Sequence, residues 1–353
     1  MLRKFSSLAA TVAVFVLFAP VGDVLAANYG FAGGSPRPDG KTYWSDIANW
    51  QGGYMGGYIG ANSTAYFDGT VSSIGNTVGG LTLGYTGLST SLNGSGTLWV
   101  LSGTFTSTGA ITLGKPKSYS VAGTLKVQGG TCITNGIGSA DANNSFVDVF
   151  GGVLDLSSAS IAANVTAVSF SSGTIQNLSS ARITSLSGSG TVSNLTGTLT
   201  MDLAANSVYS GTISGSGAGT VAKTGAGILT FDPNGAMDLA GLTGTTGIKF
   251  KFDLGSSDLI TIGAGGLNLS PSTVIEFANT EMPTSGSFRL FAGNFGTPTL
   301  SNFILPTAPD GKSFELSTTA DPGYISLQIV PEPATMLLLG IGGLAAIIRR
   351  RRR

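Results

Sequence analysis

Three segments of the chain carry the same alternation of apolar and other residues. Residues 97–105, 124–132 and 146–154 superimpose without gaps. One alternating set is always aliphatic, and it runs through Leu98, Leu125, Val147, Val100, Val127 and Val149. The interleaved set, which includes Trp99, Lys126 and Asp148, has no common chemistry. This period of two predicts strands that place one face in a core and leave the other face free.

A second motif repeats in step with the first. It reads Leu-Thr-Leu-Gly at 81–84, Ile-Thr-Leu-Gly at 111–114 and Asn-Gly-Ile-Gly at 135–138. Its intervals are 30 and 24 residues, and those of the first motif are 27 and 22 residues. Two short strands per unit of this length, with glycine at the corners, predict the coils of a parallel β-helix. An antiparallel sandwich is the alternative, and the near-constant repeat length favours the β-helix.

A related pattern occupies residues 209–231. A turn rich in glycine and serine precedes Lys-Thr-Gly-Ala-Gly at 223–227, and an apolar strand pattern follows. Through Lys223, Thr224, Gly225 and Gly227 this segment resembles the autotransporter-associated β-strand repeat. The resemblance implies a right-handed β-helix, the architecture of many secreted passenger domains.

Residues 249–329 depart from the repeat pattern. Further apolar strands are predicted here, and prolines lengthen the loops between them. We expect a β-rich module that caps the open end of the solenoid, because an uncovered sheet edge promotes aggregation. Its boundary is expected near the turn cluster at 232–235.

The end of the chain has three consecutive parts. They are the box Val330, Pro331, Glu332 and Pro333, the apolar segment 334–348, and the arginines Arg349, Arg350, Arg351, Arg352 and Arg353. Because proline disfavours a helix interior, the helix is predicted to begin after Pro333. The apolar segment extends about 22 Å as a helix, which is short of the roughly 30 Å hydrocarbon core. We therefore expect one marginal transmembrane helix with its arginines in the cytoplasm.

This order of parts resembles the PEP-CTERM sorting signal of exported bacterial proteins, with residues 330–333 matching its Val-Pro-Glu-Pro box. The resemblance implies a partner, exosortase, a membrane-embedded cysteine transpeptidase that removes the tail and passes the protein towards the cell surface. A plain membrane anchor is the alternative, but an anchor has no need of a Pro-Glu-Pro box.

The amino terminus indicates export as well. Arg3 and Lys4 precede an apolar segment at 8–18, and Val-Leu-Ala at 24–26 is a cleavage site of small residues, so we expect a signal helix that is cleaved between Ala26 and Ala27. The predicted fold is all-β, a right-handed parallel β-helix with a capping module. The predicted segments are a signal peptide (1–26), a Trp- and Tyr-rich N-terminal cap (27–80), β-helix repeats (81–232), a C-terminal β-rich module (233–329) and the sorting signal with its transmembrane helix (330–353).

Composition supports an ordered, extracellular body. Charged residues make up 10% and apolar residues 42% of the chain, which argues against disorder although 54 of 353 residues are glycine. Without Arg3, Lys4 and the terminal arginines, and without Asp23 and Glu332, the 18 basic and 18 acidic residues become 11 and 16. This mildly acidic body argues against nucleic acid as a partner.

Several kinds of catalysis lack their usual residues. The chain contains no histidine, the common base for serine and cysteine nucleophiles and the commonest metal ligand. Cys132 aligns with the core positions Phe105 and Leu154, so we interpret it as a buried apolar residue that forms no intramolecular disulfide. No calcium-binding pattern is present, and neither a cofactor nor a metal is expected. We therefore expect no enzymatic activity.

Three functions remain as hypotheses. The first is a structural or adhesive role at the cell surface or in the extracellular matrix, in contact with exopolysaccharide or envelope glycans. The second is a carbohydrate-binding module that uses Trp44 and Trp50, although these rings could instead plug the first coil. The third is a β-helix polysaccharide lyase or hydrolase, which would need carboxylates such as Asp148, Asp155 and Asp141 to converge, with Lys126 one coil earlier.

Overall fold

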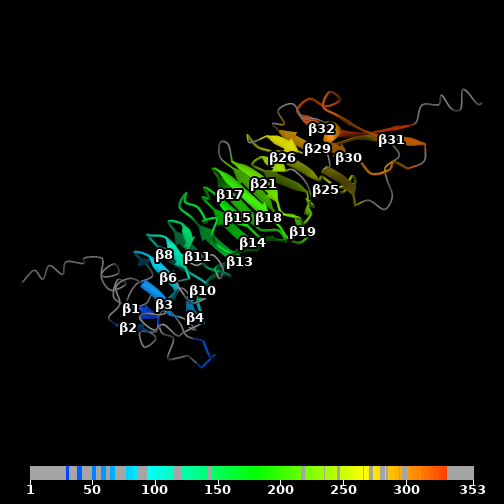
Figure 1. Ribbon diagram of the computed structural model, residues 1–353. Helices are drawn as coiled ribbons and strands as arrows, with labels where there is room; N and C mark the ends of the chain where they lie inside the picture. Colours follow the sequence, from blue (N-terminus) through cyan, green and yellow to red (C-terminus); the bar gives the residue numbers. More distant parts are fainter. Residues whose placement is uncertain are drawn as a thin grey trace, which may run out of the picture.

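The computed structural model describes strands and loops along most of the body. The described residues are 29–31, 38–41, 50–52, 57–60, 64–67, 77–85, 94–114, 121–140, 145–215, 219–233, 235–244, 247–264, 266–269, 273–278, 283, 285–293, 295, 300–309 and 311–331. They form an elongated all-β body in which the coils follow one another along the long axis (Figure 1). Within these ranges there is no α-helix, only the short 3₁₀ helix η2 (Leu300–Asn302).

Four sheets account for the strands in the described ranges. The first contains, in spatial order, β12 (Ile137–Ser139), β9 (Ile111–Leu113), β6 (Leu81–Tyr85), β3 (Gly57–Gly60), β1 (Tyr29–Phe31) and β2 (Trp50–Gly52). The third contains β15 (Ala181–Ile183), β18 (Thr198–Asp202), β21 (Thr220–Thr224), β24 (Leu242–Gly244) and β27 (Leu267–Leu269). The fourth contains β19 (Ser207–Tyr209), β22 (Leu229–Phe231), β25 (Ile248–Phe252), β28 (Thr273–Phe277) and β30 (Phe303–Ile304).

The second sheet is the longest and runs along the whole described body. Its main path is β31 (Lys312–Ser317), β32 (Tyr324–Pro331), β29 (Gly286–Gly293), β26 (Leu259–Ile262), β23 (Ala236–Leu239), β20 (Thr212–Gly215), β17 (Thr191–Leu195), β14 (Ala167–Gln176), β13 (Ser145–Asp155), β10 (Val121–Val127), β7 (Gly94–Val100) and β4 (Thr64–Phe67). Beside this path lie β5 (Thr77–Val78), β8 (Thr104–Ser107), β11 (Thr131–Thr134) and β16 (Ser185–Leu186).

Strand pairing is parallel almost throughout, which is consistent with a β-helix and not with an antiparallel sandwich. Strands of successive coils pair with each other, as β7 does with β10 and β10 with β13. Antiparallel pairs in the described ranges join β1 to β2 at one end, and β32 to both β29 and β31 at the other. The predicted all-β architecture of parallel strands is confirmed.

The predicted alignment of the first motif matches the observed register. Leu125 pairs with Leu98 and with Val147, and Val127 pairs with Val100 and Val149. The side chains of all these residues are buried. Like residues therefore stack in files along the axis of the body, and this stacking builds the core from short strands.

The alignment of the second motif was wrong by two residues in its last copy. Leu81 pairs with Ile111 as expected, but Ile137, and not Asn135, pairs with Ile111. Ile137 is 2% exposed, so burial of its side chain fixes the register. The glycines in Asn-Gly-Ile-Gly resemble the motif, but Asn135 stands where the motif has its first apolar residue.

One corner of the coils is lined by glycine. The residues directly before the paired positions Thr104, Thr131, Val153, Thr174, Thr191 and Thr212 are Gly103, Gly130, Gly152, Gly173, Gly190 and Gly211. A Cβ atom on Gly173 would lie 2.4 Å from the carbonyl oxygen of Gly152, and φ at Gly173 is +81°. Only glycine allows neighbouring coils to approach this closely while the chain turns.

Parallel pairing extends beyond both ends of the predicted repeat region. At the amino-terminal side, β3 and β4 already pair with β6 and β7, inside the predicted cap at 27–80. At the other side, β20 pairs with β23 and β22 pairs with β25 across the predicted boundary at 232–235. The boundary thus falls within one continuous stack, and the division into folding units stays a prediction.

Candidate functional site

An outward-facing file of residues runs across the first described coils of the second sheet. Tyr66 pairs with Trp99, Trp99 with Lys126, and Lys126 with Asp148. The Tyr66 and Trp99 rings stack with centroids 5.4 Å apart, and the Lys126 ammonium lies 4.8 Å from the Trp99 centroid. The Lys41 ammonium lies 5.4 Å from the centroid of Tyr66. We refer to Lys41, Tyr66, Trp99 and Lys126 as the cation–aromatic ladder.

The ladder uses the ring faces that a sugar would need. Trp99 has Tyr66 against its ring and Lys126 over it, and Phe150 approaches with a centroid distance of 6.2 Å in an edge arrangement. Carbohydrate rings bind to open aromatic faces, whereas these faces contact other side chains of the chain. The geometry therefore indicates a contact that stabilises neighbouring coils.

The same ladder changes the interpretation of the predicted Lys126 and Asp148 pair. The two residues do lie opposite each other in the register, but the described ion pairs do not join them, and the ammonium of Lys126 is turned to Trp99. Sequence reasoning saw no theme in the interleaved positions. A signal was nevertheless available in the sequence. Tyr66 occupies, one coil earlier, the same strand position as Trp99 and Lys126.

Asp155 belongs to a polar ladder at another corner. Its carboxylate accepts hydrogen bonds from the Ser157 backbone N–H at 2.9 Å, from Gln176 Nε2 at 2.8 Å and from Asn177 Nδ2 at 2.9 Å. Asn177 in turn accepts a bond of 2.7 Å from Asn194 Nδ2 one coil further. Burial tends to raise the pKa of the Asp155 carboxyl, but these hydrogen bonds outweigh it and lower the pKa below its ordinary value.

This environment suits a structural carboxylate better than a catalytic acid. Asn177 and Asn194 have φ of 55° and 56°, so the ladder also holds two residues in the left-handed region at the corner. A general acid needs a raised pKa, whereas the pKa of Asp155 is lowered. Asp141, the third predicted carboxylate, lies outside the described residues.

Lys223, from the segment that resembles the autotransporter-associated repeat, points into the core. It is 2% exposed, and its ammonium donates to the carbonyl oxygens of Thr224 at 2.7 Å and Gly225 at 2.9 Å. Burial lowers the pKa of Lys223, and the nearby charge of Asp202 opposes that change. The Lys-Thr-Gly sequence thus closes its own turn, because Gly225 has φ of +78° and the lysine satisfies the turn's carbonyl groups.

Cys132 is fully buried and pairs with both Phe105 and Leu154, as the alignment predicted. Burial raises the pKa of its thiol to about 12. At neutral pH the thiol is therefore protonated and has little nucleophilic character.

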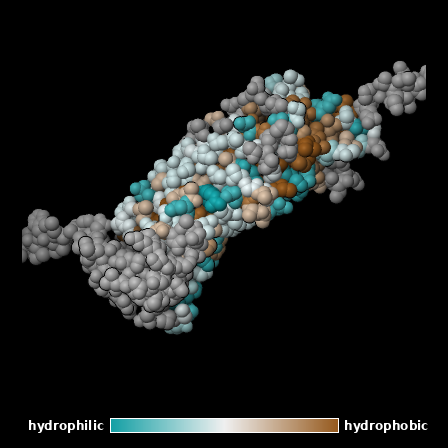
Figure 2. Space-filling view, viewed as in Figure 1, coloured by the Kyte–Doolittle hydropathy of each residue, from teal (hydrophilic) through white to brown (hydrophobic). Residues whose placement is uncertain are grey.

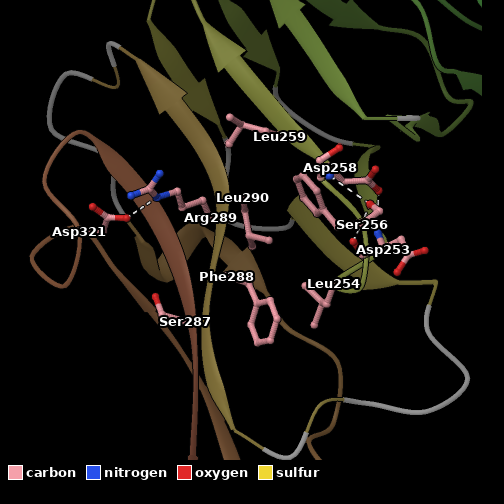
Figure 3. Close-up of a pocket in the computed structure, with 12 residues that line it drawn as sticks. Asp253, Leu254, Ser256, Asp258, Leu259, Ser287, Phe288, Arg289, Leu290 and Asp321 are labelled. Carbon is pink, nitrogen blue, oxygen red and sulfur yellow. Dashed lines mark hydrogen bonds and ion pairs between the residues drawn. The ribbon is translucent and has the colours of Figure 1, made fainter.

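A pocket of about 450 Å³ lies near the carboxyl-terminal end of the body. Its wall consists of the turn between β25 and β26, part of β29, and Asp321 from the turn before β32. Figure 3 shows Arg289 and Asp321 at one end, Phe288 and Leu254 in the middle, and Asp253 and Asp258 at the other end. Polar groups at both ends of an apolar surface are typical of a site for a small polar ligand.

The charged groups of this pocket are held in place by contacts within the chain. Arg289 forms an ion pair with Asp321, and its guanidinium carbon lies 4.1 Å from the ring centroid of Tyr324. The Asp258 carboxylate accepts hydrogen bonds from the backbone N–H groups of Gly235 at 3.0 Å and Asp253 at 2.7 Å. Arg289 keeps more than half of its side chain exposed, so it can still donate to a ligand.

Sequence reasoning did not find this pocket, and it has none of the predicted site residues in its wall. Trp50 begins β2, where its backbone pairs with Phe31, but its side chain lies outside what the structure describes. Trp44 lies outside the described residues, as do Ala26 and Ala27 at the predicted cleavage point. The described ranges also contain no group of three or more acidic or cysteine side chains that could hold a metal ion.

The predicted sorting box begins inside the last strand. Val330 and Pro331 are the final residues of β32 and pair with Ser313 and Lys312 of β31. Glu332, Pro333, the predicted transmembrane helix at 334–348 and the arginines Arg349, Arg350, Arg351, Arg352 and Arg353 lie outside the described residues. Within the described ranges, no helix is both long and apolar enough to cross a bilayer.

Comparison with known families gives one result, at this end of the chain. Residues 330–353 match the family model described as the PEP-CTERM protein-sorting motif. No curated protein and no solved structure matches the chain. The motif marks an exported protein that exosortase sorts, and the resemblance of residues 209–231 to an autotransporter-associated repeat stays a prediction.

Proposed function

We propose that exosortase removes the tail of this protein and that the β-helical body then has a structural or adhesive role, without catalysis, at the cell surface or in the extracellular matrix. The proposal includes a right-handed coil that the carboxyl-terminal strands cap, a signal peptide that ends at Ala26, and exopolysaccharide or envelope glycans as neighbours. The observation that carries it is the sorting motif at 330–353, which begins within the last strand of an all-β body.

The make-up of the body supports a structural role. Its core is a continuous stack of apolar side chains, and a glycine corner keeps successive coils in close contact. The groups that enzymatic chemistry would need have other partners, since Asp155 is hydrogen-bonded within a ladder and Lys126 lies on Trp99. A long, regular body is suited to spacing or linking other surface polymers.

The sorting part is tested by intact mass and cell fractionation of the native protein. The comparison variant carries Glu332→Ala and Pro333→Ala, which leave Pro331 in β32. We expect the native protein to lack its arginine tail and to reach the surface, and the variant to stay at full length in the inner membrane.

The control variant carries Pro306→Ala and Pro309→Ala in the described loop after β30, and it should be processed like the native protein. Processing of both variants at the native rate would show that the Pro-Glu-Pro box is not a sorting signal.

The pocket supports a second candidate, a carbohydrate-binding role at a place other than Trp44 and Trp50. Phe288 and Leu254 offer apolar surface to a sugar ring, and Arg289 with the neighbouring serines offers hydrogen bonds. Binding to polysaccharide isolated from the producing cells can be measured by co-sedimentation. We expect Arg289→Ala to weaken binding about tenfold if the pocket holds sugar, since one charge-assisted contact contributes about that factor. Arg182→Ala, which also removes an ion-paired arginine but far from the pocket, is the matched control.

A further inference from the structure

The carboxyl-terminal end of the core is only partly covered. In the described part of the chain, the large apolar side chains that pack against the core while remaining half-exposed are Phe277, Phe288, Phe295, Leu300, Leu305, Phe314 and Leu316. All of them follow residue 276, whereas the core residues of the preceding coils are buried. Covering this surface would remove apolar area from water, so contact with another molecule or surface is favourable here.

These side chains belong to the last strands and to the segments between them. The rings of Phe277 in β28 and Phe314 in β31 meet with centroids 5.5 Å apart. Ile304 in β30 pairs with Val274 of β28 and is 52% exposed. Figure 2 shows apolar residues gathered at the carboxyl-terminal end of the body, while the middle coils are mostly polar or neutral on the visible face. We refer to Phe277, Ile304, Leu305, Phe314 and Leu316 as the exit surface.

The chain leaves the body beside this surface. β31, which carries Phe314 and Leu316, is the edge strand of the second sheet, and its Lys312 pairs with Pro331. Only Glu332 and Pro333 separate Pro331 from the apolar segment at 334–348. Even fully extended, this connection spans only about 10 Å. A tail that enters a membrane therefore holds Pro331 and its partner Lys312 close to the lipid headgroups, and Phe314 of the exit surface follows two residues, about 7 Å, further along β31.

We propose that the exit surface contacts the outer lipid surface of the inner membrane as long as the tail is uncleaved. The inference rests on the proposed sorting function, because the tail must first enter the membrane. The short connection keeps lipid at the exit surface at a high effective concentration, whereas a second copy must arrive by diffusion. On β31, Phe314 and Leu316 share the core-facing side of their partners Ile329 and Leu327, so lipid meets the part of them that stays exposed, together with Ile304 on the outer side of the fourth sheet.

Contact with lipid also explains why an incompletely covered end is tolerated in an exported protein. The membrane covers the surface while the tail is inserted, and removal of the tail exposes it when the protein leaves for its destination. There the same surface is free to meet envelope polymers or other proteins.

A fluorophore on a single cysteine tests the proposal. The native cysteine, Cys132, is fully buried, so it does not react with the dye, and an introduced surface cysteine is labelled selectively. Ile304→Cys places the dye on the exit surface. Val208→Cys is the matched control, because Val208 is 53% exposed and belongs to the same outward file of the fourth sheet, four strands away.

The labelled full-length proteins are reconstituted into phosphatidylcholine vesicles with and without a lipid that carries a headgroup-level quencher. We expect the quencher to reduce emission at position 304 about twofold or more and to leave position 208, about 19 Å further along the stack, nearly unchanged. Both substitutions are at exposed positions, so both variants are expected to fold.

Each other outcome overturns the inference. Equal emission with and without quencher at position 304 would show that the exit surface stays in water. Equal quenching at both positions would show that the body lies flat on the bilayer. Shielding of position 304 that depends on protein concentration, without quenching, would assign the surface to a second copy.

Alkaline extraction of the same vesicles separates this inference from the proposed sorting function. A protein released by alkali has no inserted tail, and the sorting proposal then fails together with the inference. A protein that is retained by the vesicles but unquenched at position 304 leaves the sorting proposal intact and overturns the lipid contact alone.

Discussion

The coils between residues 94 and 215 and those after residue 219 bury their core in different ways. In the first group, aliphatic side chains such as Leu98 and Leu125 stack on their own kind, and glycine recurs at one corner. In the second group the core also contains an aromatic cluster, in which Phe231, Phe250, Phe252, Phe291 and Phe303 form a chain of ring contacts. The strand direction also reverses there, at β32.

The difference shows what repetition can and cannot do for a solenoid. An inner coil is covered on both sides by copies of itself, so small repeated residues suffice to fill the space between coils. The last coil has no further copy to cover it. Large aromatic rings and the antiparallel strand β32 take the place of the next coil. They leave Phe277 and Phe314 partly exposed.

The largest effect is expected from emptying the aromatic core. Phe250 is fully buried and contacts the rings of Phe231, Phe252 and Phe291, so Phe250→Ala should lower the free energy of unfolding by about 4 kcal/mol. Phe314→Ala is the control, and it should cost about 1 to 2 kcal/mol because half-exposed rings lose less burial. Urea unfolding of both variants measures the difference, and equal costs would contradict the view that the terminal core depends on its aromatic centre.

The next effect concerns the glycine corner of the regular coils. Gly173→Ala places a Cβ atom against the Gly152 carbonyl oxygen at a positive φ, and should lower the free energy of unfolding by about 3 kcal/mol. Gly138→Ala, where a Cβ atom has no neighbour within 4 Å, should change it by less than about 0.5 kcal/mol. Thermal or urea unfolding separates the two, and a neutral Gly173→Ala would mean that the coils can spread at this corner.

The smallest effect is a pH dependence of the polar ladder in the regular coils. The pKa of Asp155 is lowered in the folded state, so its ionised form contributes stability above the ordinary value near 3.9, and this contribution is lost as the pH falls through the folded pKa. At neutral pH, Asp155→Asn should lower the free energy of unfolding by about 1 kcal/mol, since the variant replaces an acceptor-only group. The difference from the native protein should shrink below about pH 4.

Urea unfolding over a series of pH values measures this effect. Asp148→Asn on the same strand is the control, because the described part of the chain provides no hydrogen-bond donor to Asp148, and at neutral pH it should cost less than Asp155→Asn. A pH-independent cost for Asp155→Asn would show that shape, and not charge, matters at this corner.

The strand alternation made the regular coils predictable. Leu98, Leu125 and Val147 are apolar at every repeat, and the observed register pairs these residues. The copy at 135–138 misled the alignment because its glycines resembled the motif, whereas burial of Ile137 determines the true pairing. Periodic apolar positions therefore predict a register better than recurring glycines do.

Contacts between coils were not predictable in the same way. The cation–aromatic ladder joins Tyr66, Trp99 and Lys126, which share no residue type and so leave no repeat in the sequence. The pocket joins Asp253, Arg289 and Asp321 from three separate segments. Such sites depend on which coil lies beside which, and on how long each loop is.

The sequence by itself determined the all-β architecture of parallel strands, the buried position of Cys132 and the sorting motif at the carboxyl terminus, because each is a local pattern that alternation or a short consecutive motif expresses. Only the tertiary structure decided where Lys126 points, how the polar ladder holds Asp155, and that the exit surface lies beside the point where the chain leaves the body. These depend on side chains that are distant in the chain and adjacent in space, and stacking brings them together only after the register of every coil has been fixed.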